Sequence, residues 1–191
     1  MKKSKLEAAE TRRKIVKTAA AEFRQNGING TGLSDLMAAA GLTHGGFYRH
    51  FESKDQLVAE ACAAAIESVT ETTWAPLLLQ SKRNALEAIV ADYLSEDHRD
   101  DQREGCPFAA LGSELARSDE NVRAAATQGL LKLVDIIAKQ FPGLRPDIAK
   151  RRALVTLSTM VGAVTLARMV TDSKLSTALL RESAKHVAAM S

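Results

Sequence analysis

The sequence predicts an all-α protein of about nine helices, and three observations lead to that prediction. Alanine and leucine are abundant, while alternating runs of β-branched residues are scarce. Hydrophobic residues make up 46% of the chain and charged residues 26%, as in an ordinary globular protein. The 191 residues suffice for one well-buried domain, or for a small domain joined to a larger one.

The first helix is expected over residues 7–25. Ile15, Ala19 and Phe23 recur at four-residue spacing and form one apolar stripe. Gly27 should close this helix, because glycine readily adopts the left-handed backbone found after many helices. One face of the helix is therefore expected to be buried.

Two short helices should follow. Thr31 can cap the first of them, over residues 33–40, and Gly41 should end it. Thr43 can cap the second, over residues 43–50. Helix, short helix, turn and short helix is the order of a helix-turn-helix, whose second short helix lies in the major groove of DNA.

The rest of the chain should also be helical. Ser53 and Gln56 form a capping box, after which a long helix is expected to about Thr72. Pro107 and Pro146 suit the first position of a helix. Further helices are expected over residues 81–94, 107–117, 119–140, 147–171 and 175–190.

The second short helix carries residues suited to DNA. Gly45 and Gly46 have no side chain to keep the phosphate backbone away. Tyr48 shares a face with Gly45 and His44, and its hydroxyl can reach a phosphate. Phe47 should instead point inward. The candidate DNA contacts are Thr31, Thr43, His44, Gly45, Tyr48, Arg49 and Lys54.

Two of these interpretations have a plain structural alternative. Arg49 either contacts DNA or faces solvent, and the next two residues, His50 and Phe51, read as scaffold. The first 17 residues contain seven Lys/Arg against two Glu, although the net charge of the whole chain is only +3. A local basic segment is typical of contact with a polyanion, but a solvated helix face would look similar.

The segment "GLTHGGFYRHFESKDQL" resembles the recognition helix and following helix of TetR-family transcriptional regulators. The likeness covers about residues 12–61 and includes "AAEFRQNG" and "GTGLSDL". One departure is Met37, where the family usually has a small residue. The resemblance implies a DNA-binding domain over residues 1–56 and a ligand-binding and dimerisation domain over residues 57–191.

The implied protein is a repressor that binds a palindromic double-stranded operator as a homodimer and is released by an unidentified small-molecule inducer. The last two helices would form the dimer interface, with Val161 and Val164 in or beside it. The candidate ligand-binding residues are Cys106, Phe108, Leu111 and Met160.

Cys106 supports an alternative, a thiol-based sensor or enzyme. It precedes Pro107 at a predicted helix start, where backbone N–H groups lower the pKa of a thiol. A small cap residue is the structural alternative, and an architectural DNA-binding protein without a ligand is a further rival. Cys62 reads as core packing.

The sequence gives little support to other classes of protein. His98 lies in an acidic run that is expected to be a solvated loop, and the spacing matches no known metal pattern, so neither a metal nor a cofactor is expected. No catalytic constellation is apparent, and an enzyme is not expected. The longest charge-free stretch, residues 153–167, is too short to span a membrane. With two cysteines and no signal peptide, a cytoplasmic protein without membrane partners is expected.

Overall fold

The computed structural model describes residues 5–81 and 84–189, and within these ranges every regular element is helical. This confirms the predicted fold class. The elements are α1 (Lys5–Asn26), α2 (Leu33–Ala39), the 3-10 helix η1 (His44–Arg49), α3 (Lys54–Ser68), the π-helix η2 (Val69–Trp74), α4 (Ala75–Gln80), α5 (Ala85–Tyr93), α6 (Glu96–Asp100), α7 (Pro107–Leu115), α8 (Glu120–Ala138), α9 (Pro146–Met169) and α10 (Ser173–Ala189).

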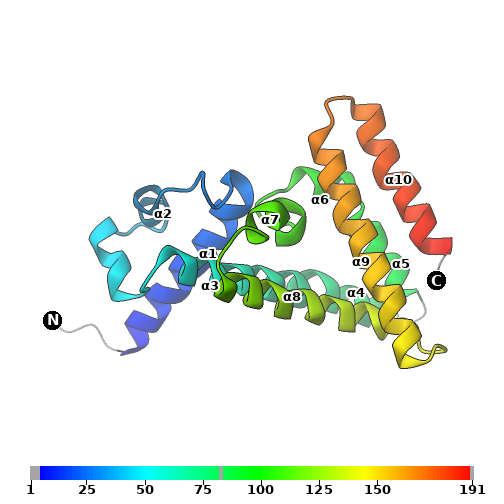
Figure 1. The fold of residues 1–191 in the computed structure, drawn as a ribbon, viewed down its shortest axis with the longest axis horizontal. Coiled ribbons are helices and arrows are strands. Elements are labelled where there is room, and N and C mark those ends of the chain that lie inside the picture. The colour runs from blue at the N-terminus through cyan, green and yellow to red at the C-terminus, as the bar shows by residue number, and fades with distance from the viewer. Residues whose placement is uncertain (1–4, 82–83, 190–191) are drawn as a thin grey trace.

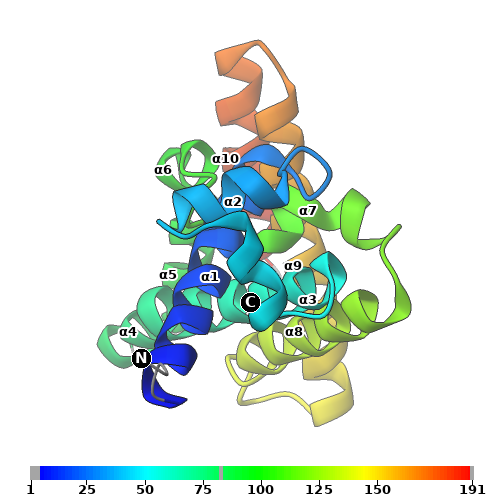
Figure 2. The same ribbon diagram turned by 90° about the vertical axis from the view of Figure 1, so that its left-hand side faces the viewer.

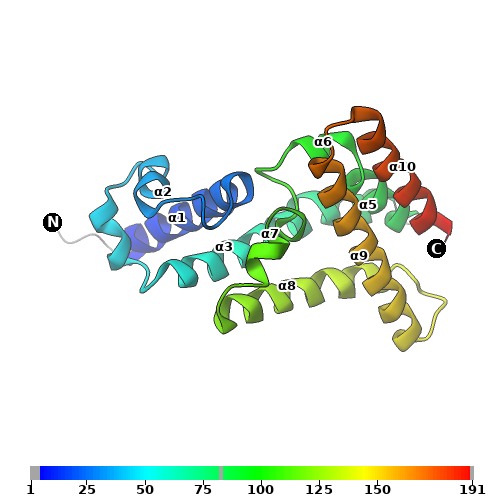
Figure 3. The same ribbon diagram turned by 45° about the horizontal axis from the view of Figure 1, so that its top comes forward.

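The molecule is elongated, with the short N-terminal helices at one end and α9 and α10 at the other (Figure 1). The long helices α3 and α8 pack side by side and connect the two ends (Figure 3). Seen end-on, α2 and the segment after it stand in front of α1 (Figure 2). The candidate DNA-contacting segment therefore lies at the end of the molecule farthest from α10.

Buried apolar residues form two cores. The N-terminal core joins α1, α2, η1 and the first part of α3, and it includes Leu111 and Leu115 of α7. The C-terminal core joins the later helices and includes Cys106 at the start of α7. Both α3 and α7 thus contribute to each core, so the two halves of the chain share continuous helices.

Several helix ends agree with the sequence predictions. Gly27 and Gly41 have φ of 79° and 69°, the left-handed region in which glycine is favoured. Ser53 caps α3 by accepting a hydrogen bond from the Gln56 N–H at 3.1 Å. Pro107 opens α7 and Pro146 opens α9, where the missing N–H of proline costs nothing.

Three local predictions were wrong. Thr31 does not cap α2, because Gly32 holds the cap position and the Thr31 hydroxyl donates backward to the Gly27 carbonyl at 2.7 Å. Helical structure does not end near Thr72 but continues through η2 and α4 to Gln80. The π-helical turn lies directly before Pro76, whose ring and missing N–H disturb the regular hydrogen-bond ladder.

The third wrong prediction is the acidic run near residue 96, expected as a loop. It forms α6, because Ser95 accepts a hydrogen bond from the His98 N–H at 3.0 Å. Glu96 and Asp97 in the first turn face the positive end of the helix dipole, which favours acidic side chains.

Candidate nucleic-acid interface

The turn between α2 and η1 has the hydrogen bonds of a Schellman motif. The Gly41 N–H donates to the Ala38 carbonyl and the Leu42 N–H donates to the Met37 carbonyl, both at 2.8 Å. These bonds satisfy carbonyls at the end of α2 that would otherwise lack partners. The angle between α2 and η1 is therefore set by a closed backbone turn.

Met37 lies beside Gly46 where α2 meets η1. Met37 is fully buried, and its Cε atom lies 3.7 Å from the position that a Cβ on Gly46 would occupy. This separation is ordinary van der Waals contact, so a Cβ at position 46 would also fit. The larger residue at position 37 is accommodated because its flexible side chain packs within the N-terminal core.

Two aromatic rings anchor η1 to the N-terminal core, as predicted. Phe47 is fully buried and Phe51 is 2% exposed, and their rings stack with centroids 5.4 Å apart. The Arg12 guanidinium lies 4.2 Å from the Phe51 ring centroid and also pairs with Glu60 of α3. The side of η1 that faces the N-terminal core is therefore held in place.

The opposite side of η1, with the residue before it, forms an exposed surface that we call the reading face: Thr43, His44, Gly45, Tyr48 and Arg49. Tyr48 is 65% exposed, which confirms its predicted orientation. Its ring makes edge contacts with Phe47 at 5.1 Å and His44 at 6.4 Å. The tyrosine is therefore held in place while its hydroxyl end faces outward.

Thr43 occupies the cap position of η1, but its hydroxyl makes no capping hydrogen bond within the described residues. The expected side-chain cap was therefore wrong. η1 is also a 3-10 helix and not an α-helix, with the Gly46 N–H donating to the Thr43 carbonyl at 2.9 Å. Thr43 is nevertheless exposed with the rest of the reading face.

Lys54 and Thr31, two further candidate DNA contacts, use their polar atoms inside the fold. The Lys54 ammonium donates to the Ile28 carbonyl at 2.6 Å and to the Thr31 carbonyl at 2.7 Å. Thr31 is 5% exposed, with its hydroxyl bound to Gly27. In this conformation both residues stabilise the α1–α2 turn, so their contacts to DNA stay predictions that this geometry does not favour.

Lys14 of α1 is a residue that the sequence reasoning did not select. Its Nζ atom lies 3.5 Å from where a Cβ on Gly41 would stand, so the ammonium reaches the turn that joins α2 to η1. Lys14 had been counted only as part of the basic segment. Its place beside the turn makes it a candidate phosphate contact, and only the packing of α1 against α2 reveals it.

The four candidate ligand residues are not brought together around one ligand-sized space. Cys106 and Met160 are fully buried in the C-terminal core, while Leu111 belongs to the N-terminal core. Phe108 packs against both cores. Leu111 lines a cavity of about 10 Å³, room for roughly one water molecule.

The alternative of a reactive thiolate at Cys106 is not favoured by the structure. Backbone N–H groups of α7 do act to lower the pKa of this thiol, but complete burial outweighs them and raises it. The Cys106 N–H donates to His98 Nε2 at 3.0 Å, and His98 Nδ1 lies 2.6 Å from the Tyr93 carbonyl. His98 is therefore neutral, with Nδ1 protonated, and burial lowers its pKa.

Cys62, as expected, is a core residue, and burial raises the pKa of its thiol to about 11.

The interface prediction also needs a correction on α9. Val164 is fully buried and packs in the C-terminal core of its own chain, so it is not available to a second copy. Val161 is half-buried at the edge of that core. Leu154, Leu166 and Met169 face solvent instead, 40%, 45% and 69% exposed.

Among the described residues, His, Cys, Asp and Glu form no group of three suited to a metal ion. No helix in the part of the chain that the structure describes has the length and apolar character needed to cross a membrane.

Comparison with known proteins places the chain. Residues 15–61 match the family "Bacterial regulatory proteins, tetR family", and residues 83–186 match "Transcriptional regulator LmrA/YxaF-like, C-terminal domain". An uncharacterised HTH-type transcriptional regulator of Mycobacterium tuberculosis is 30% identical over 171 residues, which cover 84% of this chain and 86% of that protein. The probable acrEF/envCD operon repressor of Escherichia coli is 46% identical over 59 residues, 31% of this chain and 27% of that protein.

Solved structures agree. A TetR transcriptional regulator from Chloroflexus aurantiacus has a TM-score of 0.76 at 32% identity, covering 96% of this chain and 95% of that one. Reduced NemR of E. coli has a TM-score of 0.77 at 21% identity, over 93% of this chain and 95% of that one, and shares the fold. Fold and exposed helix together define a helix-turn-helix transcriptional regulator. The chain belongs to the TetR family, whose members are DNA-binding regulators and not enzymes.

Proposed function

We propose that this chain is a repressor that binds a palindromic operator as a homodimer and releases it when a small apolar molecule binds. The observation that carries the proposal is the reading face, which is exposed and polar while Phe47 and Phe51 anchor the same segment inside. A rigid helix with a solvated outer side suits insertion into the major groove. Residues 1–56 would supply DNA binding, and residues 57–191 ligand binding and assembly.

Assembly would use the outer side of α9 together with α10. Leu154, Val155, Leu166 and Met169 on α9, and Leu175 on α10, are large apolar side chains between 40% and 69% exposed. Ser158 and Gly162 lie between them and permit close helix approach. Pairing with a second copy would remove this apolar surface from water. The resulting dimer would hold its two reading faces about 34–36 Å apart, which is one turn of DNA.

The inducer would bind where the two cores meet, around Phe108. A Cβ on Gly129 of α8 would stand 3.6 Å from the Phe108 ring and 2.9 Å from Ile66 of α3, so these helices are tightly packed there. A ligand would therefore have to separate α7 from α3 and α8. Binding that favours the separated state would shift the dimer between two arrangements, only one of which matches the operator.

The test is selection of duplex DNA from genomic fragments with purified protein, followed by titration of the recovered sequence and a scrambled duplex. We expect a palindrome whose half-sites are one helical turn apart. The recovered duplex should bind on the order of 10³-fold more tightly than the scrambled one at equal salt. Equal affinity for both duplexes would contradict the proposal, as would a wild-type protein that stays monomeric on the selected DNA.

A further inference from the structure

A carboxylate from α7 binds the turn that leads from α1 into α2. Glu114 Oε2 accepts hydrogen bonds from the Ile28 N–H at 2.6 Å and the Asn29 N–H at 3.1 Å. These two residues are 85 or more positions away from Glu114 in the sequence. The contact therefore joins the helix-turn-helix to a helix that also belongs to the C-terminal core.

Gly27 makes room for this carboxylate. Its φ of 79° turns the chain after α1, and a Cβ at this position would lie 2.6 Å from Glu114 Oε1. That separation is far inside van der Waals contact, so any other residue at position 27 would displace the Glu114 side chain. The glycine is required both by the backbone turn and by the approach of the carboxylate.

Lys54 binds the same turn from α3. Its ammonium donates to the Ile28 carbonyl at 2.6 Å and to the Thr31 carbonyl at 2.7 Å. Glu114 thus takes the N–H groups of the turn while Lys54 takes its carbonyls. Hydrogen bonds to charged groups are stronger than those between neutral groups, so the turn is held from two directions.

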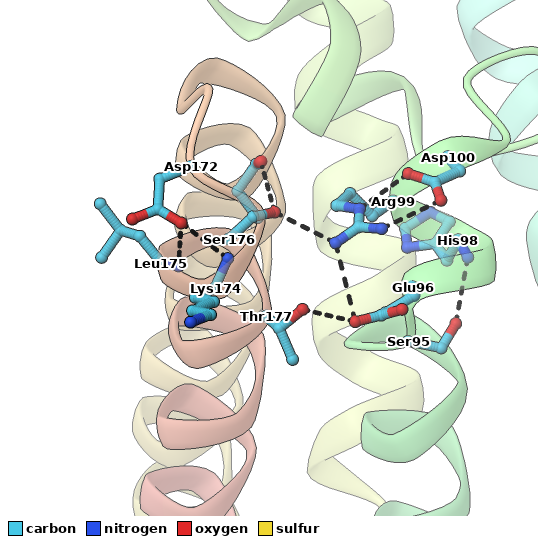
Figure 4. A network of polar contacts seen from close by, with 11 residues as sticks. Ser95, Glu96, His98, Arg99, Asp100, Asp172, Lys174, Leu175, Ser176 and Thr177 are labelled. Atoms are coloured by element: carbon cyan, nitrogen blue, oxygen red, sulfur yellow. Dashed lines mark hydrogen bonds and ion pairs between the residues drawn. The ribbon is translucent and has the colours of Figure 1, made fainter.

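Other contacts fix α7 at its opposite end. The backbone N–H of Cys106, at the start of α7, donates to His98 of α6 at 3.0 Å. Arg168 of α9 donates to the His98 and Arg99 carbonyls at 2.8 and 2.9 Å. Arg99 donates in turn to Ser176 of α10 at 3.2 Å, a contact between α6 and α10 that Figure 4 shows. The helix that carries Glu114 is therefore tied to the two helices of the proposed dimer interface.

We propose that Glu114 is a positioning residue for operator recognition, which holds the α1–α2 turn and thereby sets the orientation of the reading face relative to the rest of the dimer. The inference rests on the proposed function. The turn leads directly into α2, α2 packs on η1, and η1 presents Tyr48. Loss of the carboxylate leaves the turn held only from the Lys54 side, while Phe47 and Phe51 keep η1 folded on the core.

If Glu114 only stabilised the fold, its replacement would change the DNA affinities in a different way. A less stable protein loses specific and non-specific DNA binding in the same proportion, because both need the folded state. A wrongly oriented reading face loses base contacts and retains much of its phosphate attraction. The ratio of specific to non-specific affinity therefore separates the two roles.

The experiment titrates the full-length dimer with the selected operator and with a scrambled duplex at one salt concentration. The variants are Glu114→Ala, Glu114→Gln and, as a matched control, Ser113→Ala on the exposed side of the same helix. We expect Glu114→Ala to bind the operator roughly tenfold more weakly, since it loses two hydrogen bonds to a charged group, with the scrambled duplex nearly unchanged. Glu114→Gln should recover most of the ratio, because a single oxygen accepts both bonds.

Hydrogen exchange of residues 27–32 gives a second readout, which the wild type already provides without any DNA. We expect slow exchange at Ile28 and Asn29 in the wild type, and Glu114→Asp, which is one methylene shorter, should speed it and lower the affinity ratio. Unprotected amides in the wild type would overturn the proposal, as would an unchanged ratio in Glu114→Ala or Glu114→Asp. A wild type that does not discriminate between the duplexes would instead refute the proposed function, and the exchange result would still stand.

Discussion

Replacement of Tyr48 by alanine should weaken operator binding and leave the fold intact. The side chain is 65% exposed, so folding removes only about a third of it from water. Full burial of a large apolar side chain contributes roughly 1.5–3 kcal/mol, and a third of that is about 1 kcal/mol or less. The edge contacts of Tyr48 with Phe47 and His44 also contribute little to the free energy of unfolding, because Tyr48 itself is mostly exposed.

The expected loss in DNA binding is larger. A positioned contact to a base edge or phosphate is worth roughly 1–3 kcal/mol, and each 1.4 kcal/mol is a factor of about ten in the dissociation constant. Fluorescence anisotropy with the selected operator would measure this loss, and urea denaturation would measure the free energy of unfolding. Tyr48→Phe is the matched variant, since it removes the hydroxyl and keeps the ring.

Two results would refute the reasoning. If Tyr48→Ala unfolds at a much lower urea concentration than the wild type, the residue is part of the core and the reading face is wrongly assigned. If its operator affinity equals that of the wild type, Tyr48 does not contact DNA. A loss in Tyr48→Ala that is absent in Tyr48→Phe would assign the contact to the ring.

Four further outcomes are expected. Operator affinity should fall steeply with salt as phosphate contacts release counterions, and an unchanged affinity between low and high salt would argue against them. The free energy of unfolding should decrease as pH falls below about 6.5, because burial lowers the pKa of His98 in the folded chain. In that range the unfolded chain binds a proton at His98 that the folded chain does not. His98→Gln should lose this part of the pH dependence, as measured by thermal unfolding. Leu166→Glu should give a folded monomer by sedimentation, whereas Val164→Glu should unfold the chain because it buries a charge at a cost of several kcal/mol. Native Cys106 should react with iodoacetamide far more slowly than the unfolded protein, and rapid alkylation would contradict its burial.

Local signals predicted most of the helices and the helix-turn-helix. Gly27, Gly41 and Ser53 act within a few residues of themselves, so their effect on helix ends could be read along the chain. Phe47 and Tyr48 were assigned to opposite sides of one short helix by their spacing, and burial confirms it. The resemblance to TetR-family regulators rested on the same short segment, which the family match includes.

Long-range packing was beyond such reasoning. The basic character of Lys54 suggested a phosphate contact, but residues 28 and 31 supply carbonyls that already accept its hydrogen bonds. Activation of Cys106 by a helix start was one alternative that the sequence left open, but burial of this residue among distant helices has the larger effect on its pKa. In both cases the deciding partners lie far away in the sequence, and their proximity depends on how whole helices pack.

By itself, then, the sequence determined the helical class, most helix ends and the sidedness of η1, because periodicity, capping and glycine conformation depend on near neighbours. Only the tertiary structure decided which polar groups remain available for DNA. It placed Lys14 at the helix-turn-helix, directed Lys54 inward and brought Glu114 to the α1–α2 turn. The physical reason is that a charged side chain binds the nearest strong hydrogen-bonding group, and which group is nearest is known only once the helices have packed.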